Sequence, residues 1–252
     1  MEVLTLAARL LHPIPSPLPL QHGMLRVSGL TLESALASDA FEVVIDHRGE
    51  LAAVLLEVHG CEGRPPAQGL DGALGVVRAA LLARKPIYEV VSELRTWTAA
   101  ERHTSCAVIV LRFSLPDSRV EILNAGMPAI ACALPDGRVS LHAGLSAAIG
   151  ESFEEVHPYE LSPLVWGSKW LLLSSGLTAG SLAPEATRRL VADVEVQAGL
   201  TELSGRTPDA LAPLLDRLRG PTPEARAHDA TLLIVDADPR PRFRSGFQPS
   251  RV

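Results

Sequence analysis

Several features that this sequence lacks limit the classes of protein to which it can belong. Its 252 residues include only three cysteines, Cys61, Cys106 and Cys132, a number too small and too odd for a disulfide framework. No apolar run reaches the roughly 20 residues that cross a bilayer. The start of the chain has no basic region and no clean cleavage site, so we predict no signal peptide. We therefore expect a protein of a reducing, cytoplasmic compartment.

An excess of basic residues is also missing. The net charge is −6, which argues against a broad nucleic-acid-binding surface, so we expect a protein partner or a small ligand, with no nucleic acid or membrane involved. Apolar residues, in contrast, are plentiful. Because 47% of the residues are hydrophobic and 21% are charged, the chain can bury a substantial core, as one large domain or two small ones.

The hydrophobic pattern predicts a succession of short strands interrupted by two pairs of helices. The predicted strands are Glu2–Leu10 (or a short helix), Met24–Leu32, Ala40–Ile45, Leu51–Val58, Thr104–Phe113, Val120–Asn124, Ala129–Ala133, Val139–Leu141, Phe153–Tyr159, Lys169–Leu173 and Thr231–Val235. The predicted helices are Ala67–Ala83, one opened by Pro86, one from Pro184 to Gly199, and one from Thr207 to Gly220. The proline-rich stretch His12–His22 is expected to be extended or looped.

This order predicts the fold class. Hairpins and a meander of short strands favour antiparallel sheets, and helices in consecutive pairs argue against simple strand–helix–strand crossovers. We expect an α+β fold, a four-layer α/β/β/α sandwich whose two mostly antiparallel sheets are flanked by helix pairs.

The stretch Leu51–Gly63 draws attention because a carboxylate follows a buried strand. Glu57 ends a continuous apolar run, and a tight turn with Gly60 and Gly63 comes next. An acid beside a glycine turn at the end of a strand is a common place to hold a metal or a phosphate. The alternative is that Glu57 is a solvated charge at the end of a strand.

Four short motifs resemble those of the PPM-type, metal-dependent protein phosphatases, in particular the bacterial branch of stage II sporulation protein E. That family has Gly-Asp-x-x-Gly-His-Gly, Asn-Ala-Gly-His-Pro, Thr-Asp-Gly and Asp-Asp-x-Thr in this order. The corresponding segments here are Leu56–Glu62 (LEVHGCE), Asn124–Pro128 (NAGMP), Ser174–Leu177 (SSGL) and His228–Leu232 (HDATL). The resemblance covers roughly Glu2 to Val235. It implies a phosphatase-like domain over residues 1–237. Residues 238–252 contain four arginines and few apolar residues, so we expect a basic, disordered tail there.

The resemblance also implies a metal site, in which carboxylates hold two manganese or magnesium ions and a bridging water attacks the phosphoryl group. The family positions are occupied here by Asp39, Glu57, Gly60, Ser175, His228 and Asp229. Asp39 and Glu57 are the candidate catalytic residues.

Three of these positions are altered. Glu57 stands in place of an aspartate and reaches one methylene further. Ser175 has lost a negative charge, and His228 offers a nitrogen better suited to zinc than to magnesium. Asp39 is unchanged, and Asp229 is a possible substitute for the acid at position 228.

Structural roles are the alternatives at each position. Asp39 would then be a turn residue or a cap, Ser174 and Ser175 would satisfy backbone groups, His228 would be a surface histidine, and Met127 would pack in the core or at its rim. A separate possibility is a zinc site. Its candidate ligands are His59, Cys61, His103, Cys106 and His228, although their spacing matches no recognised zinc pattern.

The function expected from these features is binding by a pseudophosphatase, a family member with impaired or lost catalysis. The resemblance implies a partner that carries phosphoserine or phosphothreonine, a regulatory protein of the anti-sigma-antagonist type. The alternative is an active serine/threonine phosphatase that uses manganese or magnesium with ligands Asp39, Glu57, His228 and Asp229.

Overall fold

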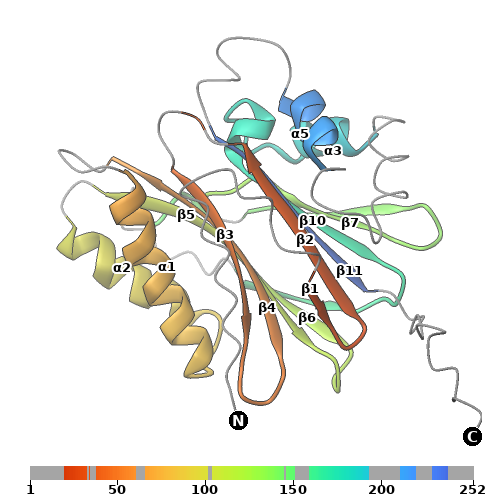
Figure 1. Ribbon diagram of the computed structural model, residues 1–252, viewed down its shortest axis with the longest axis horizontal. Coiled ribbons are helices and arrows are strands. Elements are labelled where there is room, and N and C mark those ends of the chain that lie inside the picture. Colours follow the sequence, from red (N-terminus) through yellow and green to blue (C-terminus); the bar gives the residue numbers. More distant parts are fainter. Residues whose placement is uncertain are drawn as a thin grey trace, which may run out of the picture.

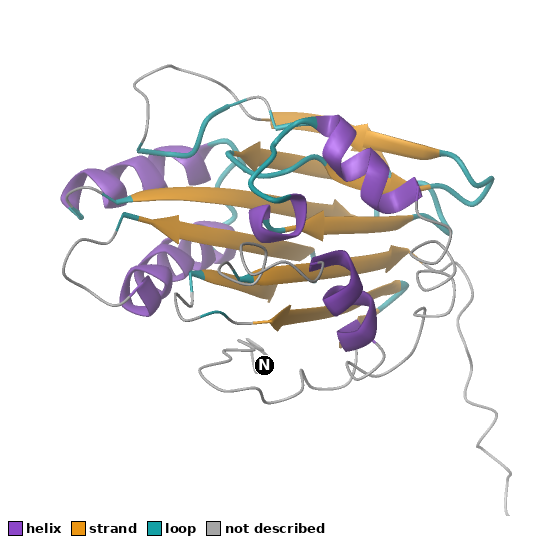
Figure 2. Ribbon diagram, turned by 90° about the horizontal axis from the view of Figure 1, so that it is seen from above, coloured by secondary structure: helices purple, strands orange, loops and turns teal. Residues whose placement is uncertain are grey.

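The computed structural model of the protein describes residues 20–32, 34, 38–60, 66–101, 104–144, 146–150, 159–192, 211–219 and 229–237. Two antiparallel sheets stack face to face, and pairs of helices lie on opposite sides of the stack (Figures 1 and 2). The predicted four-layer α+β sandwich is therefore confirmed. Among the described helices, none combines the length and apolar character needed to span a bilayer.

Two sheets of unequal size form the inner layers. The five-stranded sheet has the order β3 (Asp39–Ile45), β4 (Leu51–His59), β5 (Ser105–Ser114), β6 (Arg119–Ala125) and β9 (Tyr159–Pro163). The six-stranded sheet has the order β1 (Leu20–His22), β2 (Leu25–Leu32), β11 (Ala230–Ala237), β10 (Lys169–Leu173), β7 (Ile130–Ala133) and β8 (Val139–His142). Every pair of neighbouring strands is antiparallel.

Helices cover the outer face of each sheet. Helices α1 (Pro66–Leu82) and α2 (Glu89–Ala100) pack on the five-stranded sheet. Helices α3 (Pro184–Ala192) and α5 (Leu211–Arg219) pack on the six-stranded sheet. A short 3-10 helix, η1 (Ser175–Thr178), follows strand β10 in the chain. The three apolar clusters that result lie between the sheets and under each helix pair.

Burial on both faces explains why the central strands read as continuous apolar runs. All eight residues of β11 and the first eight of β4 are buried. A strand covered by a sheet on one side and by helices on the other has no solvent face, so polar alternation disappears.

The chain path differs from a simple meander. After β6 the chain crosses to the six-stranded sheet for the β7–β8 hairpin, returns for β9, and crosses again for β10. Local hydrophobic periodicity reports burial but not which sheet a strand joins, so this alternation was not predicted.

Several predicted boundaries need correction. A strand was predicted over Phe153–Tyr159, but the observed strand is β9, and residues 153–158 lie outside the described part. Helix α2 begins at Glu89 rather than Pro86, because Pro86 starts a turn in which its carbonyl accepts the Glu89 N–H at 2.8 Å. Part of the stretch predicted to be looped, Leu20–His22, pairs with β2 as β1. The predicted strand at residues 2–10 and the predicted helical residues 193–199 and 207–210 lie outside the described residues.

Candidate functional site

Three carboxylates from both sheets meet at one end of the sandwich. The β3–β4 register places Asp39 directly opposite Glu57 in the five-stranded sheet. Asp229 immediately precedes β11 in the six-stranded sheet, and it reaches the start of β3. We call these three residues the acidic cluster. Its fourth predicted neighbour, His228, lies outside the described residues.

Asp229 is 1% exposed, and main-chain donors occupy both of its oxygens. Oδ1 accepts the Ser34 N–H at 2.5 Å, while Oδ2 accepts the N–H groups of Ser38 and, at 3.0 Å, Asp39. Hydrogen bonds to an ionised carboxylate are stronger than neutral ones. Asp229 therefore anchors the chain before β3 to the start of β11.

Glu57 is also 1% exposed, and Ser175 binds both of its oxygens. The Ser175 N–H donates to Oε1 at 2.5 Å and its hydroxyl donates to Oε2 at 2.8 Å. His59 Nε2 lies 3.4 Å from the same Oε2, on a side chain that is 45% exposed. Ser175 is held in place because its neighbour Ser174 exchanges two hydrogen bonds with Thr231, at 3.0 and 2.8 Å.

Asp39 is partly buried beside these two acids. Its Oδ1 accepts the Ser38 hydroxyl and its Oδ2 accepts the Thr231 hydroxyl, both at 3.3 Å. Desolvation raises the pKa of Asp39 well above its usual range, and the charges of Glu57 and Asp229 raise this pKa further. Hydrogen bonds from serine hydroxyls offset only part of the shift.

The donor set does not fit a centre for two hard cations. Magnesium, for example, needs near-octahedral oxygen ligands at about 2.0–2.1 Å. Here every oxygen of the three carboxylates already accepts a hydrogen bond from a protein N–H or O–H group. Within the described residues, no three His, Cys, Asp or Glu side chains converge on a point where a metal ion could sit.

The segment Asn124–Pro128, which corresponds to the family's Asn-Ala-Gly-His-Pro motif, is buried. Asn124 Nδ2 donates to the Pro128 carbonyl at 2.9 Å, and Met127, 1% exposed, packs between the sheets, which confirms its interpretation as a packing residue. Gly126 has a φ of +71°, and a Cβ there would lie 2.6 Å from Ala148 Cα. Only glycine fits this close approach.

The turn after β4 gives mixed support to the other predictions. Gly60 is exposed and has a φ of +72°, as expected for a glycine turn. The zinc possibility finds no support from Cys106, which is 0% exposed under the helices, where burial raises its pKa to about 12. The other candidate zinc ligands, Cys61, His103 and His228, lie outside the described residues.

Sequence reasoning missed the donors that satisfy the acids. Ser38 and Thr231 both bind Asp39, yet neither was selected as a site residue. Thr231 was visible inside the HDATL motif and Ser38 directly precedes the unchanged aspartate. Their adjacency to motif acids was the available signal.

Comparisons with known proteins agree with the fold. A family model described as Stage II sporulation protein E (SpoIIE) matches residues 47–238. No curated protein sequence matches the chain. Structural similarity is found to the RsbU and RsbW domains of Rv1364c from Mycobacterium tuberculosis, with a TM-score of 0.64, 18% identity, and coverage of 84% of this chain and 61% of that chain.

Two further structures share the fold. The PP2C phosphatase domain and a regulatory fragment of SpoIIE from Bacillus subtilis give a TM-score of 0.61 at 14% identity, over 84% of this chain and 63% of that chain. RsbX, in complex with magnesium, gives 0.59 at 12% identity, over 84% and 94%. The chain thus spans less than two thirds of the length of the first two structures.

Proposed function

The chain belongs to the stage II sporulation protein E family, and from this premise we propose that it is a regulatory module of bacterial signalling with impaired or lost phosphatase catalysis. Its activity would be to bind a protein partner, phosphorylated or not. The family match and the fold both relate the chain to phosphatase-type proteins. The reducing cytoplasm is the compartment we propose, in keeping with the free, buried thiols of Cys106 and Cys132.

One observation carries the proposal: the acidic cluster is satisfied internally. The family's chemistry depends on cations that orient and activate a water at a phosphoryl group. In this chain both carboxylate oxygens of Glu57 accept hydrogen bonds from Ser175. Both carboxylate oxygens of Asp229 accept hydrogen bonds from main-chain N–H groups at and before Asp39. A cation at these oxygens would have to compete with these hydrogen bonds.

A regulatory protein is the partner class that the comparisons support. The similar structures include the RsbU and RsbW domains, RsbX, and a structure described as part of the bacterial stressosome. We propose a partner of the anti-sigma-antagonist type, a domain with a phosphorylatable serine or threonine. Because Asn124–Pro128 is buried, the exposed contact would be made around His59 and Gly60.

Turnover of p-nitrophenyl phosphate and of a phosphoserine peptide, with manganese or magnesium, tests the proposal. We expect no turnover above the cation blank and no heat of manganese binding in calorimetry. The doubly changed chain Ser175→Asp/His228→Asp should gain manganese affinity, because it restores two carboxylates at altered family positions. Cation-dependent turnover by the unchanged chain that disappears in Asp39→Asn would refute the proposal.

One observation favours a second candidate, an active serine/threonine phosphatase with an altered ligand set. The charges that act on Asp39 are those of two other carboxylates, and a cation would relieve this repulsion. Asp39, Glu57, His228 and Asp229 would then be the ligands of manganese or magnesium. The same turnover assay separates the candidates.

A further inference from the structure

We propose that Glu57 and Ser175 form a clamp that holds the two sheets together at the acidic cluster without any cation. The proposal deepens the proposed function, on which it rests for the idea that the cluster no longer serves cation chemistry. It assigns a specific task to two residues that a comparison of motifs alone would count as losses.

The geometry of the link is that of a dedicated contact. Glu57 ends β4 of the five-stranded sheet, and Ser175 begins η1 directly after β10 of the six-stranded sheet. Two donors of one residue bind two oxygens of one carboxylate, at 2.5 and 2.8 Å. A two-point contact fixes orientation as well as distance, and it does so at a carboxylate that is 1% exposed.

The lengths of the two side chains suit each other. An aspartate at position 57 would withdraw its carboxylate by about 1.5 Å, one carbon–carbon bond, which would take both contacts beyond hydrogen-bond reach. An aspartate at position 175 would set a second carboxylate against the first and remove the hydroxyl donor. A long acid opposite a short donor is the combination that closes the gap between the sheets.

A second set of hydrogen bonds, which we call the strap, also joins the two sheets at the acidic cluster. Asp229, at the start of β11, binds main-chain N–H groups at the start of β3, and the Thr231 hydroxyl donates to Asp39. The two sheets are thus joined on both sides of the cluster by N–H and O–H donors. The clamp predicts that the site end is ordered in the cation-free protein.

Thermal unfolding in EDTA and in millimolar manganese tests the clamp. The unchanged protein should melt at the same temperature in both. Ser175→Ala should lower the melting temperature by roughly 3–8 °C in both conditions, because it removes one hydrogen bond to a buried charge. Ser175→Thr keeps both donors and should restore most of the loss. The matched control is Ser181→Ala, whose hydroxyl accepts a 3.4 Å hydrogen bond from the Ala183 N–H, and it should change little.

A double-mutant cycle sharpens the test. Glu57→Asp and Ser175→Asp should each destabilise the protein in EDTA. Manganese should rescue the combined variant Glu57→Asp/Ser175→Asp by several degrees while leaving the unchanged protein unaffected. The clamp is refuted if EDTA lowers the melting temperature of the unchanged protein, or if Ser175→Ala melts like the Ser181→Ala control.

The two proposals fail in different measurements. Turnover by the unchanged protein, together with a cation-independent loss of stability in Ser175→Ala, would refute the proposed function and keep the clamp. An inert protein in which Ser175→Ala melts like the Ser181→Ala control would keep the proposed function and refute the clamp.

Discussion

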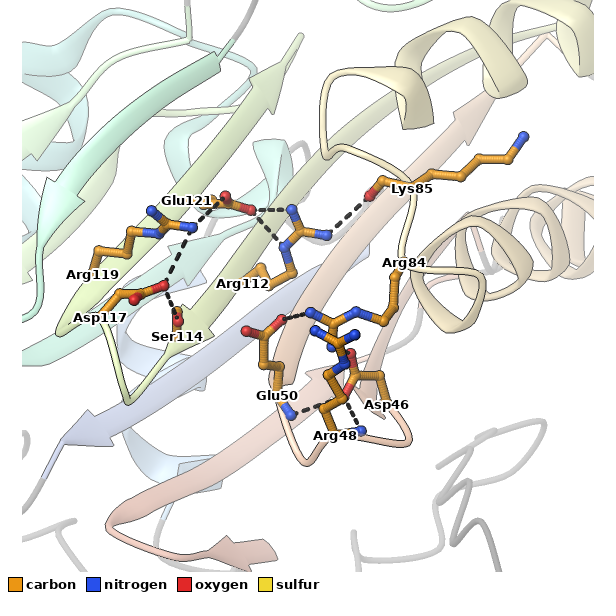
Figure 3. A network of polar contacts seen from close by, with 10 residues as sticks. All are labelled: Asp46, Arg48, Glu50, Arg84, Lys85, Arg112, Ser114, Asp117, Arg119 and Glu121. Atoms are coloured by element: carbon orange, nitrogen blue, oxygen red, sulfur yellow. Dashed lines mark hydrogen bonds and ion pairs between the residues drawn. The ribbon is translucent and has the colours of Figure 1, made fainter.

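The two ends of the strand sandwich satisfy their acidic side chains in different ways. At the acidic cluster, the partners of Asp39, Glu57 and Asp229 are main-chain N–H groups and the hydroxyls of serines and threonines. At the opposite end, where the β3–β4 and β5–β6 hairpins turn, the partners include arginine side chains (Figure 3).

The arginine end is built around the loop between α1 and α2. Arg84, in that loop, pairs with Asp46 and, at 3.2 Å, with Glu50 of the β3–β4 hairpin. Arg112 on β5 binds Glu121 on β6 and donates to the Lys85 carbonyl at 2.9 Å (Figure 3). Each guanidinium ties the helix pair to a strand hairpin.

The difference has a physical meaning. Ion pairs at the arginine end neutralise their charges within the protein, so the loss of one partner leaves a charge unpaired. At the acidic cluster most donors are neutral, and burial together with the charges of Glu57 and Asp229 raises the pKa of Asp39. We expect the replacement of a carboxylate by an amide to cost less stability at the acidic cluster than at the arginine end.

Asp229→Ala should have the largest effect, since it removes the strap at the acidic cluster. Three partly buried main-chain N–H groups would lose their acceptor, and we expect a loss of about 3–5 kcal/mol in the free energy of unfolding. Urea unfolding followed by circular dichroism measures it. A loss below about 1 kcal/mol would show that the strap contributes little.

Arg112→Met is the counterpart at the arginine end. Its removal leaves the mostly buried Glu121 with Arg119 alone, 3.8 Å away, and frees the Lys85 carbonyl. We expect a loss of about 2–4 kcal/mol by the same unfolding assay. Arg138→Met, at an exposed pair with Asp136, is the control and should leave the free energy of unfolding almost unchanged.

Matched glutamate-to-glutamine changes test the comparison itself. Glu57→Gln keeps a carbonyl oxygen for the Ser175 N–H and lowers the negative charge of the cluster, so we expect a cost under about 1 kcal/mol. Glu121→Gln leaves the Arg112 guanidinium without its counter-charge and should cost about 2 kcal/mol. Equal costs in chemical unfolding would remove the distinction between the two ends.

The smallest effect is expected from pH. Because the pKa of Asp39 is higher in the folded than in the unfolded protein, folding favours its protonated form. Its contribution to stability is therefore favourable at acid pH and declines as pH rises from about 4 through the folded pKa. Asp39→Asn should remove this decline, so its melting temperature relative to the unchanged protein should rise between pH 4 and pH 8. A constant difference across that range would contradict the assignment.

The layers of the fold could be predicted from the sequence, but the path of the chain between the two sheets could not. The apolar runs of β4, β5 and β11 identify strands buried on both faces, because burial leaves a direct trace in residue type. The entry of β9 into the five-stranded sheet left no such trace, since Tyr159–Pro163 is largely polar and partly exposed.

The acidic cluster could likewise be predicted only in part: its acids could be selected from the sequence, but their partners could not. The order of the family-like motifs was enough to select Asp39, Glu57 and Asp229, and the register of β3 and β4 places Asp39 opposite Glu57. The bond from Ser175 to Glu57 joins residues 118 positions apart on different sheets. Its existence depends on how the sheets stack and on the length of each side chain. Local patterns carry the information about burial and register, whereas the choice between a cation and a serine as the partner of a buried acid arises where distant strand ends meet.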